Sequence, residues 1–229
     1  PLAMPLRAWP RCGAPTAHRP DRAARIARSD GSVPRVFVKV CGITNRDDAL
    51  FALAMGADAI GMVLARSTRR VDPDTVRDVV QALPSDAVVV GVFRDERPET
   101  ILEVVEHARL RGVQLHGHEI PRDAALLRRK VSFLVQAFVP GDPRLARLDE
   151  YPVDAVLLDS SVPGSGVAFD WSVAEGVAPG KRVILAGGLT PDNVAAAVEQ
   201  VRPWGVDVSS GVEAEPGRKD ARKVRRFVV

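Results

Sequence analysis

From Val36 onward, short runs of β-branched and other apolar residues alternate with segments in which apolar side chains recur at helical spacing. The β-branched runs predict eight strands, at residues 36–41, 58–64, 87–93, 112–116, 132–138, 154–159, 182–186 and 205–209. The helical spacing predicts helices at residues 45–55, 73–82, 97–109, 121–129, 191–201 and 218–227. Two connections are short and irregular, around residues 143–149 and 171–176. Asp72 before Pro73 and Thr190 before Pro191 are suitable helix caps.

Strict alternation of strands and helices predicts parallel strands joined by right-handed crossovers. Eight strands within about 190 residues fit a closed barrel better than an open sheet. We therefore expect an α/β fold, a single-domain (β/α)8 barrel of the TIM type, formed by residues 36–229. A doubly wound open sheet is the alternative.

Residues 1–35 differ from the rest of the chain: they are rich in Pro, Arg and Ala and have no sustained periodicity. We expect a disordered N-terminal extension; a targeting peptide is the alternative, although a secretory signal would need an apolar core. The pI of about 9.2 comes from this extension. Residues 1–37 carry a net charge of +5 and the whole chain +3, so the remainder is mildly acidic. We therefore expect no nucleic-acid partner.

The apolar residues also bear on where the protein works. No apolar run approaches the roughly 18 residues that a membrane span requires, so we expect no membrane partner. Cys12 and Cys41 form no spacing pattern, which favours a reducing, cytoplasmic location. No HxxH or CxxC motif or carboxylate cluster predicts a metal site.

In such barrels the reacting groups lie at the carboxyl ends of the strands, so catalytic and binding residues are expected at these positions. Gly187-Gly188 follows the seventh predicted strand and Ser210-Gly211 follows the eighth. Glycine loops at these two strands commonly bind phosphate through backbone N–H groups. The alternative is that the glycines only turn the chain and Ser210 caps a turn.

Two titratable residues end predicted strands, Cys41 the first and Asp159 the sixth. A buried cysteine is usually a small core residue, and an aspartate after a strand often caps a turn. At a barrel mouth, however, a thiol and a carboxyl can form a general acid/base pair, and we expect Cys41 to face that mouth. Arg69 can hold a substrate carboxylate, or it is a solvated surface arginine. His116 is a loop residue whose role the residues alone leave open.

Several of these positions belong to longer segments that resemble phosphoribosylanthranilate isomerases, in the same order along the chain. The segments are Val38–Thr44, Val113–Gly117, Leu157–Ser160, Phe169–Trp171, Ala186–Val194, Asp207–Glu213 and Pro216–Asp220. The resemblance covers residues 36–229. It implies an enzyme of tryptophan biosynthesis that converts N-(5-phosphoribosyl)anthranilate, a phosphorylated aminosugar, into the 1-deoxyribulose 5-phosphate product without a cofactor or a metal.

The resemblance also implies roles for residues. Asp159 would be the general acid that opens the furanose ring, and Cys41 the general base that removes the C2′ proton. Arg69 would contact the anthranilate part and Asp207 its amine. Phosphate would bind at Gly188 and Ser210-Gly211, with Gly187 and His116 completing the substrate site. A monomer or a homodimer is expected.

This chain departs from the family pattern in two places. The loop after Asp159 contains Pro163 and Val167 where the family usually has Gly-Gly and a lysine, and Arg70 replaces an aromatic residue. Two other functions stay open: an isomerase that also accepts the aminoimidazole ribotide of histidine biosynthesis, and a phosphate-binding scaffold without catalysis. The first would have an aspartate where this chain has Cys41. Turnover of substrate would exclude the second.

Overall fold

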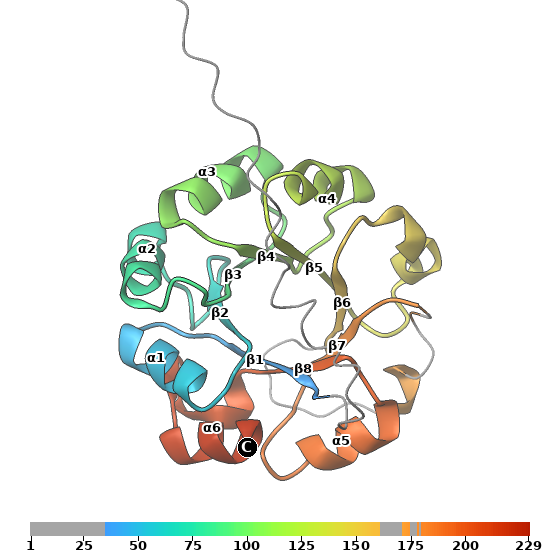
Figure 1. The fold of residues 1–229 in the computed structure, drawn as a ribbon. Helices are drawn as coiled ribbons and strands as arrows, with labels where there is room; N and C mark the ends of the chain where they lie inside the picture. Colours follow the sequence, from blue (N-terminus) through green and yellow to red (C-terminus); the bar gives the residue numbers. More distant parts are fainter. Residues whose placement is uncertain (1–34, 161–170, 175–177, 179) are drawn as a thin grey trace, which may run out of the picture. The chain divides into compact units, whose positions relative to one another are not determined.

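Eight parallel strands close into a ring, in which β1 is hydrogen-bonded to β2 on one side and to β8 on the other (Figure 1). The computed structural model describes residues 35–160, 171–174, 178 and 180–229. The strands are β1 (Phe37–Cys41), β2 (Ala59–Val63), β3 (Val89–Phe93), β4 (Gly112–Leu115), β5 (Phe133–Phe138), β6 (Ala155–Leu158), β7 (Val183–Leu185) and β8 (Gly205–Val208). The predicted (β/α)8 barrel is confirmed, and the open doubly wound sheet is excluded.

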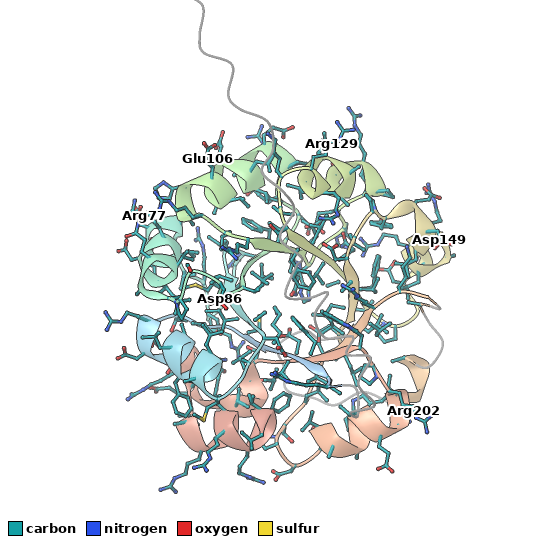
Figure 2. All side chains as sticks on the ribbon, in the orientation of Figure 1. Arg77, Asp86, Glu106, Arg129, Asp149 and Arg202 are labelled. Atoms are coloured by element: carbon teal, nitrogen blue, oxygen red, sulfur yellow. The ribbon has the colours of Figure 1, made fainter. Side chains whose placement is uncertain are left out.

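Helices surround the ring (Figure 1). They are α1 (Arg46–Ala54), α2 (Pro73–Ala82), α3 (Pro98–Ala108), α4 (Pro121–Arg128), α5 (Val194–Val201) and α6 (Ala221–Val228). The described parts of the connections after β5 and β6 contain 3₁₀ helices, η2 (Pro143–Glu150) and η3 (Trp171–Ala174), in the places where irregular connections were predicted. Charged side chains such as Glu106, Arg129 and Asp149 lie on the outer rim (Figure 2). Within the described ranges, no helix has the length and apolar character needed to cross a membrane.

Helix α5 begins later than predicted, at Val194, because the residues before it form a turn. Asn193 Oδ1 accepts a hydrogen bond from Thr190 N at 2.7 Å, and Asn193 Nδ2 donates to Gly188 O at 2.9 Å. The N-cap of α5 is therefore Asn193, and Thr190 caps the preceding turn instead, where its Oγ1 accepts from Asp192 N at 3.3 Å. The expected cap of α2 is confirmed, since Asp72 Oδ1 accepts from Thr75 N at 2.8 Å. Such a cap typically contributes about 1 kcal/mol.

Helix α6 also begins later than predicted, because the residues before it form a hairpin. Strand β9 (Glu213–Glu215) pairs antiparallel with β10 (Arg218–Lys219), and a 3₁₀ turn, η4 (Ser210–Val212), joins β8 to β9. Asp220 then caps α6 by accepting hydrogen bonds from the backbone N–H groups of Arg222 and Lys223, both at 2.9 Å. The hairpin consequently lies directly after the last barrel strand, near the predicted active-site end.

Alternate positions on the strands face two different interiors. On β1, Val38 and Val40 belong to the hydrophobic core between strands and helices, so Lys39 and Cys41 point into the barrel. The amino end of the barrel interior is closed by aromatic rings: the Phe37 centroid lies 4.5 Å from that of Trp204 and 5.8 Å from that of Phe133. The polar interior side chains therefore lie towards the carboxyl ends of the strands. They include Lys39, Gln114 and Asp207, all buried.

Candidate active site

The predicted acid and base stand at the carboxyl ends of strands on different sides of the barrel. Cys41 is the last residue of β1, and Asp159 directly follows β6. Strands β1 and β6 lie on different sides of the ring (Figure 1). Asp207 lies near the end of β8, and His116 directly follows β4. Because the strands are parallel, these residues share one end of the barrel, as predicted.

Cys41 is buried, with 7% of its surface exposed. It stands opposite Gly61 of β2, and a Cβ added to Gly61 would lie only 2.6 Å from Cys41 Sγ. The sulfur therefore occupies the space that a side chain on β2 would fill. Burial raises the pKa of the Cys41 thiol, and the positive charges of Lys39 and Lys219 act in the opposite direction. In this state of the protein, the thiol is the favoured form.

Lys39 and Asp207 form a buried ion pair inside the barrel. The two residues are register partners on β1 and β8, and Lys39 Nζ donates to Asp207 Oδ1 at 2.9 Å. Burial alone would lower the pKa of Lys39, but the charges of Asp207 and Cys41 outweigh that, and its pKa is raised. Sequence reasoning proposed Asp207 but missed Lys39. The available signal was a lysine in an otherwise apolar strand, at an inward position two residues before Cys41.

Asp159 is buried and has two neighbours that orient its carboxylate. Asp159 Oδ1 accepts a hydrogen bond from Ser160 N at 2.7 Å, and His116 Nε2 lies 3.4 Å from Asp159 Oδ2. The other ring nitrogen, His116 Nδ1, is 2.8 Å from Gln114 Nε2. The structure therefore brings His116 and Asp159 together. It also places Gln114 beside His116, a residue that the sequence indicated only as a member of the Val113–Gly117 segment.

Arg69 is anchored by Glu213, a residue that sequence reasoning did not single out. Arg69 Nε and Nη2 each donate to a different carboxylate oxygen of Glu213 at 2.7 Å, and Lys219 Nζ donates to Glu213 Oε1 at 2.9 Å. Burial opposes ionisation of Glu213, but the hydrogen bonds from Arg69 and the charge of Lys219 outweigh it, so its pKa is lowered. Arg69 has a side-chain exposure of 12%, so it is no solvated surface residue.

The loop after β1 brings Arg69 next to the end of β8. A Cβ added to Gly42 would lie 2.6 Å from Arg69 Cδ and 2.7 Å from Ser209 Oγ. The loops after the first, second and eighth strands therefore converge here. Nearby, Arg66 and Arg70 are exposed, and so is His118, with a side-chain exposure of 80%.

The loops after β7 and β8 approach each other as closely as backbone allows. Gly187 and Gly188 have φ values of +81° and +68°, which favour glycine. A Cβ added to Gly211 would lie 1.9 Å from Leu189 O, so only glycine fits there. Ser210 begins η4 beside this contact. A Cβ added to Gly187 would lie 3.0 Å from Asp159 Oδ1, so the same loop also borders the predicted acid.

Over residues 35–160 and the described parts of 171–229, no three His, Cys, Asp or Glu side chains are arranged to bind a metal ion. The loop with Pro163 and Val167 lies outside the described residues, as does most of the Phe169–Trp171 segment.

The family model for N-(5'-phosphoribosyl)anthranilate (PRA) isomerase matches residues 38–229, which is nearly all of the barrel. The chain belongs to the PRA isomerase family. A PRA isomerase from Desulforudis audaxviator is 46% identical over 199 residues, which cover 84% of this chain and 96% of the relative. The predicted isomerase activity is the activity of this family, so the chain is an aldose–ketose isomerase of tryptophan biosynthesis.

Solved structures of PRA isomerases have the same barrel. The enzyme from Thermus thermophilus is 45% identical, with a TM-score of 0.78 over 84% of this chain and 96% of that one. A second, 38% identical PRA isomerase was solved with reduced 1-(o-carboxyphenylamino)-1-deoxyribulose 5-phosphate, with a TM-score of 0.75 over 85% of this chain and 97% of that one. The ligand of that relative carries the phosphate and the carboxylate that the sequence led us to expect in a substrate.

Proposed function

We propose that this chain catalyses the Amadori rearrangement of N-(5-phosphoribosyl)anthranilate with Asp159 as general acid and Cys41 as general base. One observation carries the proposal: Cys41 ends β1 and Asp159 directly follows β6, so both lie at the same end of one barrel, Cys41 beside Lys39 and Asp159 beside His116. Neither reacting group is replaced in this chain.

In the first step, Asp159 donates its proton to the furanose ring oxygen. The C1′–O bond breaks as the anthranilate nitrogen supplies its lone pair to C1′, which gives an open-chain, protonated Schiff base. Asp159 is left as a carboxylate, which Ser160 N and His116 are placed to stabilise. A proton must return to Asp159 before the next turnover.

In the second step, the thiolate of Cys41 removes the proton from C2′. The electrons of that C–H bond form the C1′–C2′ double bond of an enolamine, and the iminium nitrogen becomes neutral. Protonation at C1′ and loss of the enol proton then yield the ketone. The buried thiol has to ionise for this step, and the cations Lys39 and Lys219 favour its ionised form.

The remaining site residues would bind the two anionic ends of the substrate. The phosphate would lie at the converging loops of Gly187, Gly188, Ser210 and Gly211, whose close approach leaves backbone N–H groups unobstructed by side chains. Arg69, fixed by Glu213, would face the anthranilate carboxylate, and Asp207 its amine. His116 would lie against the substrate beside Asp159.

The test is turnover of Cys41→Ser and Asp159→Asn, followed by fluorescence of the anthranilate adduct. General acid/base groups typically contribute ~10²–10⁴-fold, so each variant should lose that order in kcat while a product analogue still binds. The matched controls are Cys12→Ser and Asp149→Asn, the same substitutions away from the site; both should retain turnover. Retention of more than about a tenth of wild-type turnover by both site variants would overturn the assignment.

Further expectations concern the N-terminal extension, the location of the enzyme and its assembly, and the same preparation tests the last of these. We propose that residues 1–35 form an N-terminal extension, and that the enzyme works in the cytoplasm as a monomer or homodimer. A 38% identical PRA isomerase from Thermotoga maritima is described as dimeric. Light scattering after size-exclusion chromatography would give the mass in solution, and a larger assembly would contradict this proposal.

A further inference from the structure

The cation closest in sequence to the proposed base has no direct route to substrate. Lys39 is 0% exposed, and it lies two residues before Cys41 on the inward side of β1. A lysine that is wholly buried must be matched by an anion, because an unpaired charge inside a protein is very costly. Asp207 supplies that anion, at 2.9 Å from Lys39 Nζ.

The ammonium of Lys39 also lies close to the sulfur of Cys41, at the space above Gly61. A Cβ added to Gly61 would lie 3.1 Å from Lys39 Nζ and 2.6 Å from Cys41 Sγ, so both atoms border the same point. An opposite charge within about 4–6 Å favours the ionised form of a group. The missing side chain at Gly61 therefore creates a shared cradle for an ammonium and a thiol on the neighbouring strand.

We propose that Lys39 is a positioning residue of the isomerase, whose ammonium is shared between Asp207 and Cys41 and serves as the counter-cation of the Cys41 thiolate. The inference rests on the proposed role of Cys41 as base. When Cys41 loses its proton to solvent or another group before the reaction, the ammonium balances the new negative charge; when the thiolate takes the C2′ proton, Lys39 returns to Asp207 alone. Lys39 stays protonated throughout, so no proton passes through it.

Other charged groups face this cluster and set the background for the effect of Lys39. Asp207 of β8 opposes ionisation of Cys41, and Lys219 of β10 favours it. Arg69, after β2, interacts with Cys41 from its ion pair with Glu213. Asp159 and His116 act on Asp207 from across the barrel. Lys39 differs from the other cations because it borders the same cradle as the sulfur.

The test measures the ionisation of Cys41 directly, without substrate. In a Cys12→Ser background, Cys41 is the remaining cysteine of the chain, and its rate of alkylation by iodoacetamide reports the thiolate fraction. In Lys39→Met, the midpoint of the rate–pH curve should rise by at least about one unit, a roughly tenfold loss of rate below the midpoint. The rate at high pH should recover to that of the parent. Lys130→Met, the same change at an exposed lysine, should leave the curve unchanged.

A second variant removes the contact without removing a charge. In Gly61→Ala the new methyl group would displace Cys41 Sγ from the ammonium, so the midpoint should also rise. If circular dichroism shows that Lys39→Met does not fold, the alkylation midpoint of Gly61→Ala tests the proposal instead. An unchanged midpoint in every variant that folds would overturn the proposal.

Turnover separates this inference from the proposed function. In Lys39→Met, kcat should fall about tenfold near neutral pH and recover as the pH rises, with KM little changed. A purely structural effect would lower kcat equally at every pH, and that result would count against Lys39 as counter-cation. If the proposed role of Cys41 as base is wrong, turnover will survive in Cys41→Ser. That result does not depend on how the alkylation rate of Lys39→Met varies with pH.

Discussion

Replacing Glu213 by Gln tests whether the Arg69–Glu213–Lys219 cluster holds the anthranilate end of the site. Gln keeps the size of the side chain but removes its charge, and its NH₂ group would face a donor of Arg69. Three hydrogen bonds to cations, at 2.7, 2.7 and 2.9 Å, are then weakened or lost. Arg69 and Lys219 are left nearly buried, with side-chain exposures of 12% and 2%, without their anion.

The expected cost follows from breaking a buried ion pair by removing one partner, about 3–5 kcal/mol. For a domain of this size, 1 kcal/mol corresponds to about 2–4 °C in Tm, so Tm should fall by about 6–20 °C. KM should also rise, because Arg69 loses the two bonds that fix its guanidinium. Differential scanning fluorimetry and steady-state kinetics measure the two effects.

Glu215→Gln is the matched control, two residues along the same strand. Glu215 pairs with Arg218 at 3.4 Å, but both side chains are more than half exposed, at 64% and 73%. An exposed pair of this kind contributes at most about 1 kcal/mol. If Glu213→Gln lowered Tm no more than Glu215→Gln and left KM unchanged, the reasoning about this cluster would be refuted.

Three more predictions concern other parts of the chain. Removing residues 1–34 should change Tm and turnover little, because the deletion keeps Arg35, which pairs with Asp58 at 3.3 Å; a Tm loss of many degrees would contradict this. Gly188→Asp should raise KM at least about tenfold more than Gly188→Asn, which strains the backbone equally but adds no charge beside the phosphate; equal KM values would move the phosphate elsewhere. The lowered pKa of Glu213 stabilises the fold above the unfolded-state pKa of about 4.5, and this contribution is lost as pH falls through the folded-state pKa. As the pH is lowered, the free energy of unfolding of Glu213→Gln should therefore fall less than that of the wild type, as measured by acid unfolding.

The sequence alone determined the barrel and the ends of its strands. Periodicity is a local property: β-branched runs alternating with helical spacing predict parallel strands, and parallel strands bring their carboxyl ends to one side. Cys41, Asp159 and Asp207 could be placed at one end of the barrel for that reason. The late starts of α5 and α6 escaped prediction because Asn193 and the β9–β10 hairpin use side-chain and long-range bonds that apolar periodicity does not record.

Only the tertiary structure decided which charges meet. Lys39 and Asp207 are 168 residues apart, and Arg69 and Glu213 are 144 apart, so their pairing depends on closure of the barrel between β1 and β8 and on the hairpin after β8. The position of Cys41 Sγ likewise depends on Gly61 of the neighbouring strand. The ionisation of these groups depends on distance and on exclusion of water, and both quantities arise only when distant segments pack together.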